Sequence, residues 1–229
     1  MAAAPRCVIL GGGGHARMLL DCLGDGAIIV DGIVDADRKR WGTRLDGCEI
    51  LGGDERLPEL ARTGTTHFVV GIGSIGKAGL LLRRRLFELG LRCGLKPLVI
   101  QHPSAIRSTH AQVGAGAQLL PGCIVNAGAQ IGANVIINSG AIVEHDCVVE
   151  DHAHVAPGAR LLGKVHVQTG AHVGAGATIL QTLTIGANAV VGAGAVVVDD
   201  VPAETTVVGV PARPWVKPVG QAQTPQAIR

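Results

Sequence analysis

The sequence places a histidine directly before an acidic residue in the segment VEHDCV, as His145 and Asp146. An imidazole titrates near neutral pH, so His145 can accept a proton at cellular pH and act as a general base. A neighbouring carboxylate can orient such an imidazole and stabilise its charged form. Asp is also ordinary at turns, so a purely structural role for Asp146 stands beside this catalytic hypothesis.

A second candidate site is the glycine-rich segment GGGGHA, which follows the apolar run CVIL and precedes the helical stretch RMLLDCL. The order strand, glycine loop, helix sets the N–H groups of a helix N-terminus against phosphate. Gly11, Gly13 and Ala16 also satisfy the dinucleotide fingerprint, with Asp31 or Asp35 about 20 residues further on. An NAD-dependent dehydrogenase is therefore an alternative, although no domain for hydride transfer follows.

The elements around this loop predict a small Rossmann-like α/β domain at 1–100. Apolar strands are expected at 7–10, in AIIVDGIVD and in HFVVGIG, and the last of them runs into a second glycine turn, GSIGKAG. Helical segments at 54–62 and 77–90 alternate with these strands. Such alternation is typical of a parallel sheet with helices packed on it.

The second half of the chain is a hexad repeat, with 15 consecutive hexads from Val113 to Pro202. The first position of every hexad is Val, Ile or Leu, and the fifth is Ala, Cys, Val or Leu. The fourth is Gly, Asn or Asp in 12 of the 15, and these residue types tolerate the positive φ of a sharp corner. Short straight segments joined by regular corners predict a parallel β-solenoid, with a domain at 101–216 and a disordered tail at 217–229.

Composition and charge exclude several classes of partner. The net charge of +2 divides into +3 for residues 1–100 (14 Lys and Arg, 11 Asp and Glu) and −1 for the rest (6 against 7), and the chain has only two Phe and two Trp. We therefore expect no nucleic-acid partner. Six widely spaced cysteines without a CxxC pair are typical of reduced thiols. No signal peptide or apolar membrane span is visible, so we expect no membrane partner and a cytoplasmic location.

The two halves together resemble the hexapeptide-repeat sugar acetyltransferases of the sialic-acid O-acetyltransferase and bacillosamine-type nucleotide-sugar N-acetyltransferase family. GGGGHA, the strand ending in Asp35, VVGIG and the solenoid with VEHDCV and HVAPGA carry the resemblance, which covers about 7–215. It implies a left-handed β-helix with three hexads per coil, hence five coils. It also implies a homotrimer with active sites between subunits, acetyl-CoA as cosubstrate and a nucleotide-linked amino sugar as partner.

The resemblance assigns substrate contacts to both halves. Gly13, Gly14 and His15 match the phosphate-side loop of the family, Asp35 its base or ribose contact, and Gly73 its second loop. Asn138 and His154 match residues near the sugar and the acetyl group. His154 and His172 are 18 residues apart, one coil, so we expect them to stack on one edge; His172, His166 and His152 are interpreted as surface residues.

The resemblance also supplies the acetyl-CoA contacts. Gly163 matches a glycine whose N–H faces the thioester carbonyl, and Ala175 and Ala193 match positions along which CoA lies, together with His154. From the residues alone, Ala175 and Ala193 are equally well explained as small corner residues. Zinc carbonic anhydrases share the β-helix, but they use two His five residues apart; no such pair occurs here among the solenoid histidines, so no metal is expected.

These observations predict an acetyl-CoA-dependent N-acetyltransferase that acts on the amine of a nucleotide-linked sugar, with His145 as base and with a place in polysaccharide biosynthesis. Cys147 and Cys123 sit at inward positions, so no acyl-enzyme is expected. One alternative is an O-acetyltransferase acting on sialic acid or a related sugar. The other is a scaffold without catalytic activity.

Overall fold

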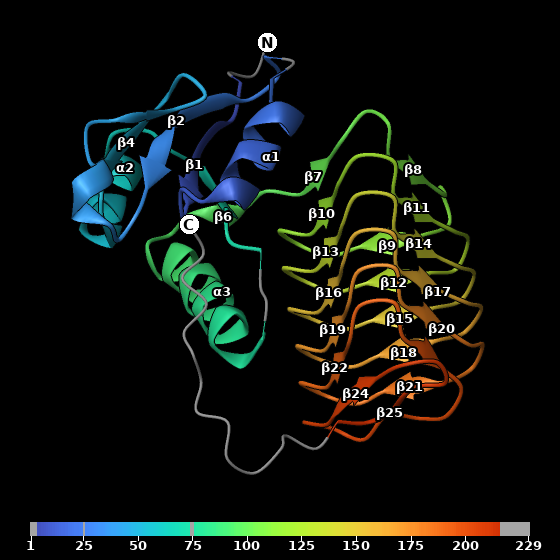
Figure 1. The fold of residues 1–229 in the computed structure, drawn as a ribbon. Coiled ribbons are helices and arrows are strands. Elements are labelled where there is room, and N and C mark those ends of the chain that lie inside the picture. Colours follow the sequence, from blue (N-terminus) through green and yellow to red (C-terminus); the bar gives the residue numbers. More distant parts are fainter. Residues whose placement is uncertain (1–3, 25, 74–75, 216–229) are drawn as a thin grey trace, which may run out of the picture.

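The chain folds into an α/β domain and a tall stack of short strands that lie side by side (Figure 1). The computed structural model describes residues 4–24, 26–73 and 76–215, so the predicted tail at 217–229 lies outside the described residues. The α/β domain lies beside the upper coils of the stack, and its last helix runs down along the stack (Figure 1).

The α/β domain contains a six-stranded sheet in the order β3-β4-β2-β1-β5-β6, parallel except between β3 and β4. Its strands are β1 (Arg6–Leu10), β2 (Ile29–Val34), β3 (Arg44–Leu45), β4 (Cys48–Gly52), β5 (His67–Val70) and β6 (Lys96–Pro97). Central β1 is fully buried from Cys7 to Leu10, as an apolar strand of a covered parallel sheet should be. The strands predicted from the sequence correspond to β1, β2 and β5, whereas β3, β4 and β6 lie in segments without a clear period of two.

Helices cover this sheet and connect its strands. They are α1 (Gly14–Cys22), the 3-10 turns η1 (Arg38–Arg40) and η2 (Asp54–Arg56), α2 (Leu57–Arg62) and α3 (Gly76–Arg92). The predicted helix at 54–62 corresponds to η2 followed by α2, and the one at 77–90 corresponds to α3. Buried Leu19 and Leu86 show how α1 and α3 each turn an apolar side to the sheet.

The stack has three faces, and each is a sheet of short, mostly parallel strands. The first face contains β7 (Ile100–Gln101), β10 (Gln118–Leu119), β13 (Ile136–Ile137), β16 (His154–Val155), β19 (His172–Val173), β22 (Val190–Val191), β24 (Thr206–Val208) and the antiparallel β25 (Arg213–Pro214). The second contains β8 (Ile106–Arg107), β11 (Ile124–Val125), β14 (Ile142–Val143), β17 (Arg160–Leu161), β20 (Thr178–Ile179) and β23 (Val196–Val197). The third contains β9 (Gln112–Val113), β12 (Gln130–Ile131), β15 (Val148–Val149), β18 (His166–Val167) and β21 (Thr184–Ile185). The fold is thus a Rossmann-like α/β domain followed by a left-handed parallel β-helix.

Each hexad builds one face and one corner. Large first-position residues such as Leu119 alternate in the core with small fifth-position residues such as Ala117 and Cys123. Fourteen of the 15 fourth-position residues have φ between +53° and +75°, including non-glycine residues such as Asn134 and Thr182. Each corner is named after the face that precedes it along the chain. The first corner therefore follows the first face, the second corner the second face, and the third corner the third face.

The coil formed by β7, β8 and β9 begins two hexads before the 15 that the sequence pattern reveals, because Val113 of β9 already opens the first of those 15. Strands β7, β8 and β9 pair in parallel with β10, β11 and β12, so the β-helix begins at Ile100. The first hexad position of this coil is occupied by exposed Gln101 and Arg107. A terminal coil has no neighbour above it, so these positions face solvent and escape the apolar repeat.

Candidate functional site

The second corner holds the predicted His–Asp pair. His145 and Asp146 follow β14, and His145 Nδ1 lies 2.9 Å from Asp146 Oδ2. Because a carboxylate only accepts hydrogen bonds, Nδ1 carries the proton and Nε2 presents a lone pair. Both side chains are more than half exposed, so a substrate can reach Nε2. Asp146 also takes a positive φ, so it combines the turn role with the orienting role.

Gly163 lies one coil further along the same corner, after β17. A Cβ atom at this position would lie 2.6 Å from His145 Nε2. Only glycine therefore leaves the lone pair of His145 open. The backbone N–H of Lys164 donates to His145 O at 2.9 Å, which fixes the two coils in register.

A pocket of about 610 Å³ lies elsewhere, on the lower part of the first face and along the first corner. It gathers five of the residues singled out from the sequence, namely Gly73, Asn138, His154, Ala175 and Ala193. Its other lining residues are Gly76, Ala156, Pro157, His172, Gly174, Val190, Val191 and Gly192. His172, expected at the surface, lines this pocket instead, because the α/β domain overhangs the first face. The lining is mostly small and apolar, which suits close approach of a ligand.

Asn138 and His154 form a defined pair within the pocket. Asn138 Oδ1 accepts the backbone N–H of Ser139 at 2.8 Å, which orients the amide. Asn138 Nδ2 therefore donates to His154 Nε2 at 3.0 Å, and that nitrogen is unprotonated. His154 contacts His172 edge to face, with ring centroids 4.9 Å apart, so the predicted stacking is confirmed. Burial lowers the pKa of His172.

The glycine loop lies at the carboxyl edge of the sheet. Gly13 caps α1, and the space where side chains of Gly13 and Gly14 would lie is open. Gly11 has φ +95°, a conformation that favours glycine. Asp35 Oδ2 accepts the Gly12 N–H at 2.7 Å, so the carboxylate at the end of β2 ties the loop to the sheet.

Asp35 has further partners. Its Oδ1 accepts the backbone N–H of Asp37 at 2.8 Å, and Arg40 lies 3.4 Å from Oδ2 while also donating to Gly12 O. Asp35 lines a small cavity of about 180 Å³ together with Gly11 and Ile72. A nucleoside contact for Asp35 stays a prediction.

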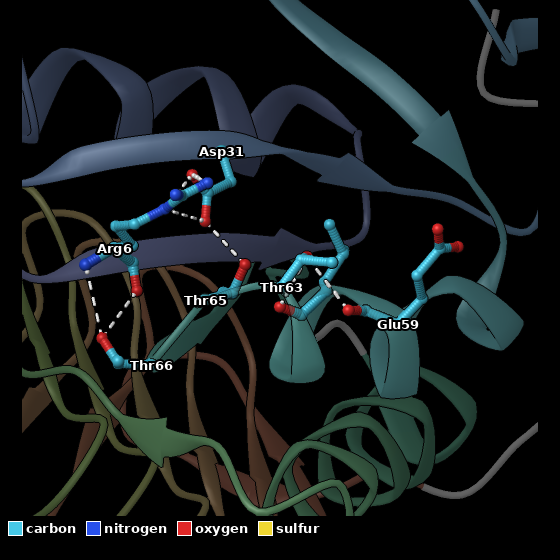
Figure 2. A network of polar contacts seen from close by, with 7 residues as sticks. Arg6, Asp31, Glu59, Thr63, Thr65 and Thr66 are labelled. Atoms are coloured by element: carbon cyan, nitrogen blue, oxygen red, sulfur yellow. Dashed lines mark hydrogen bonds and ion pairs between the residues drawn. The ribbon is translucent and has the colours of Figure 1, made fainter.

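Asp31, the other acidic candidate for the dinucleotide fingerprint, serves the opposite end of β1. Figure 2 shows its carboxylate held by Arg6 and Thr65, with Arg6 Nη2 at 2.7 Å and Thr65 Oγ1 at 2.6 Å. Its side chain is only 6% exposed. Asp31 therefore stabilises the sheet and lies away from the glycine loop.

His15 connects the loop to the β-helix. Gln118 Nε2 donates to Val70 O at 2.9 Å, which turns Gln118 Oε1 towards His15 Nε2 at 2.7 Å. His15 therefore donates from Nε2, and burial lowers its pKa to about 4, so Nδ1 is unprotonated. Neither nitrogen can donate to a phosphate. This geometry gives the His15 side chain the role of holding the loop in place, and the place of His15 in a phosphate-binding loop stays a prediction.

The buried thiols of the β-helix are not placed to act as nucleophiles. Burial raises the pKa of Cys123 to about 12 and that of Cys147 to about 11, and both side chains face the core of the β-helix. Neither can supply a thiolate nucleophile near neutral pH. Across the part of the chain that the structure describes, no His, Cys, Asp and Glu side chains gather as a metal site, and no helix has the length and apolarity to cross a membrane.

Within one chain, the predicted site residues of the β-helix thus form two groups on different corners. His145, Asp146 and Gly163 lie on the second corner, whereas Asn138, Ala175 and Ala193 lie on the first, beside His154 on the first face. The structure does not bring the two groups together in one subunit.

Two family profiles match the sequence. Residues 6–86 match the PglD N-terminal domain, and residues 110–145 and 128–163 match the bacterial transferase hexapeptide (six repeats). No curated protein matches the sequence.

Solved structures are similar over nearly the whole chain. A histidine variant of perosamine N-acetyltransferase from Caulobacter crescentus, in complex with CoA and GDP-perosamine, is 36% identical with a TM-score of 0.87, over 94% of this chain and 99% of that one. The acetyltransferase domain of PglB from Neisseria gonorrhoeae, in complex with acetyl coenzyme A, is 30% identical with a TM-score of 0.84, over 93% and 100%. WeeI from Acinetobacter baumannii is 28% identical with a TM-score of 0.74, over 91% and 99%. The chain therefore belongs to the hexapeptide-repeat nucleotide-sugar N-acetyltransferase family and is an acyltransferase.

Proposed function

We propose that this protein transfers the acetyl group of acetyl-CoA to the amine of a nucleotide-linked amino sugar. The pocket on the first face carries this proposal. It is lined by Asn138 and His154, by small residues of the first corner, and by Gly73 of the α/β domain. A sugar entering from the α/β side and a thioester lying along the corner would meet in this pocket. The complexes of the perosamine enzyme with CoA and GDP-perosamine support both ligand classes.

The acetyl-CoA side is supported by the lining of the first corner. Ala175, Ala193 and their glycine neighbours leave backbone groups accessible along successive coils. A long pantetheine chain fits such a lining, because small residues allow close contact with backbone N–H and C=O groups. No metal is needed for this binding.

The nucleotide side is assigned to the carboxyl edge of the sheet. Gly13 and Gly14 begin α1 with open space around them, so the first N–H groups of this nine-residue helix can meet a diphosphate. Asp35 and Gly73 flank this loop, and His15 keeps it seated on the β-helix. The sugar would then extend from the diphosphate towards Asn138 and His154.

His145 is proposed as the general base. The unprotonated sugar amine attacks the thioester carbonyl, a C–N bond forms, and the C–S bond breaks to release CoA as a thiol. His145 Nε2 takes the proton that the amine loses, and Asp146 holds the ring and stabilises its charged form. Gly163, next to Nε2, is proposed to offer its N–H to the thioester oxygen.

A homotrimer is proposed because one chain separates the base from the pocket. The second corner with His145 must come from a neighbouring subunit if it is to reach the first corner with Asn138. In a closed ring of three subunits with head-to-tail interfaces, the second corner of each subunit can face the first corner of the next. We also propose a cytoplasmic location, where both substrates are available.

The test is thiol release from acetyl-CoA with a panel of UDP-, GDP- and CMP-linked sugars in amino and hydroxyl forms. We expect turnover with an amino sugar, lost in His145→Ala and kept in His110→Ala, a control at another exposed histidine. Turnover with hydroxyl sugars alone would favour the O-acetyltransferase. No thiol release with any sugar, together with no acetyl-CoA binding by calorimetry, would contradict the enzyme proposal and favour a scaffold without catalytic activity.

A further inference from the structure

Helix α3 lies along the third corner of the β-helix. That corner is a column of fourth-position residues with positive φ, spaced one coil apart: Gly116, Asn134, His152, Gly170 and Asn188. Side chains of α3 that are three or four positions apart face this column, as one side of a helix does. Leu80 fills the space beside Gly170, and Phe87 fills the space beside Gly116.

Between these two apolar contacts, α3 makes a polar one. Arg83 is fully buried, and its Nη2 donates to both Asn134 O and Asn134 Oδ1, the latter at 3.0 Å. Asn134 Nδ2 donates in turn to His152 Nδ1 at 2.9 Å, and the ring of His152 meets the ring of Phe87 edge to face at 5.6 Å. Arg83 therefore fixes α3 on two successive coils.

Stability alone does not explain this arginine. Its Nε and Nη1 have no hydrogen-bond partner, and none of the described carboxylates forms an ion pair with it. Burial lowers the pKa of Arg83 to about 9, so the side chain stays charged at neutral pH. Replacing a buried, uncompensated charge by an apolar side chain is often neutral or stabilising. A buried guanidinium at this place points to specificity of position.

The position that it fixes belongs to the pocket. Gly76 begins α3 two turns before Arg83, and both Gly73 and Gly76 line the pocket opposite His154. Where α3 sits on the third corner therefore sets the distance between this wall and the first face.

We infer that Arg83 is a positioning residue, which holds α3 on Asn134 and His152 so that Gly73 and Gly76 stand at the right distance from Asn138 and His154 for the sugar. This inference rests on the proposed function of the pocket. It assigns Arg83 no contact with substrate.

The experiment compares Arg83→Met, Arg83→Lys and Asn134→Gly in the full-length protein. Asn134→Gly keeps the corner, because glycine occupies the same place at 116 and 170, and Asn188→Gly is the matched control in the same column. The readouts are KM for the nucleotide sugar, KM for acetyl-CoA, and hydrogen exchange of α3 amides.

We expect Arg83→Met to raise KM for the nucleotide sugar about tenfold or more, since a small misplacement is costly to binding geometry. KM for acetyl-CoA should change less than about twofold, Arg83→Lys should recover part of the loss, and Asn134→Gly should act in the same direction. Faster hydrogen exchange in α3 would show that Arg83 holds this helix on the third corner even if the protein turns over no nucleotide sugar. Failure of the inference can therefore be told apart from failure of the proposed function. Unchanged KM and unchanged α3 exchange in Arg83→Met and Asn134→Gly would overturn the inference.

Discussion

The first face of the β-helix presents the same outward position in every coil, but its upper and lower halves differ in what covers them. In the upper half, Ile100, Gln118 and Ile136 are buried under the α/β domain. In the lower half, His154 and His172 occupy that position and line the pocket. The repeat thus supplies a uniform row of outward positions, which lie in a domain interface in the upper half and in the lining of a pocket in the lower half.

The two halves also treat histidine differently. His15, against the upper half, has its N–H bonded to Gln118 and is held neutral by burial. His154, in the lower half, has its Nε2 occupied by Asn138. Neither is a free base, whereas His145 on the second corner is exposed and oriented by Asp146. The difference separates two histidines that are held by hydrogen bonds from the one that is proposed as the base.

The largest expected effect is on the base. His145→Ala should lower kcat/KM by about 10²–10⁴-fold, because general base catalysis is lost. Acetyl-CoA should still bind to the lower half, since that half does not contain His145. Steady-state kinetics and calorimetry measure the two effects. If the variant lost acetyl-CoA affinity by as large a factor as it lost kcat/KM, His145 would be needed for binding acetyl-CoA as well as for catalysis, contrary to this prediction.

The next largest effect concerns the domain interface on the upper half of the first face. Ile136→Ala should lower the free energy of unfolding by about 2–5 kcal/mol, because it opens a cavity in a fully buried interface. Val190→Ala, at the matching outward position of the lower half, should change it by about 1 kcal/mol or less. Chemical denaturation of both variants makes the comparison. Equal losses would show that the two halves are covered alike.

The pH dependence of stability tests the role of His15 in the upper half. The pKa of His15 is about 4 in the folded chain against 6.5 for a free imidazole, so between these pH values the unfolded chain binds a proton that the folded chain does not. Stability should therefore fall as pH drops from 6.5 to 4, with His15 accounting for up to about 3 kcal/mol. His67, His152 and His172, whose pKa values are also lowered, act in the same direction.

The variant His15→Gln isolates this contribution, because its Nε2 amide can replace the imidazole Nε2–H as the donor to Gln118. Its free energy of unfolding, measured by denaturant titration between pH 4 and 7, should depend less on pH than that of the wild type. An identical pH dependence in both proteins would show that His15 is solvated in the folded state.

How far the sequence predicts the structure depends on how local each interaction is. The hexad pattern predicts the β-helix because each corner needs only its own fourth-position residue, and His145 and Asp146 meet because they are adjacent. His154 and His172 meet because one coil is 18 residues. The first two hexads of the β-helix, 101–112, are missed because Gln101 and Arg107 break the pattern at an exposed end.

Contacts between the domains are beyond such patterns. His15 and Gln118 are 103 residues apart, and Arg83 and Asn134 are 51 apart, so no spacing rule connects them. The same limit explains His172, whose place in the pocket depends on the α/β domain above the first face. Burial by another domain leaves no trace in the local sequence.

The smallest expected effect concerns the lower half alone. Asn138→Ala removes the amide that bonds His154 Nε2, so the imidazole loses its fixed orientation in the pocket proposed to hold the sugar. We expect KM for the nucleotide sugar to rise about fivefold to tenfold, the equivalent of one hydrogen bond of about 1 kcal/mol. The free energy of unfolding should hardly change, because Asn138 is at the edge of the pocket. Kinetics of the variant provide the measurement.

Ser139→Ala is the matched control, since its backbone N–H remains while its hydroxyl lies 3.5 Å from Asn138 Oδ1. It should leave KM unchanged. If Asn138→Ala instead lowered stability and left KM intact, Asn138 would belong with the upper half as a packing residue. A rise in KM without loss of stability would support the proposal that Asn138 and His154 contact the sugar in the pocket of the lower half.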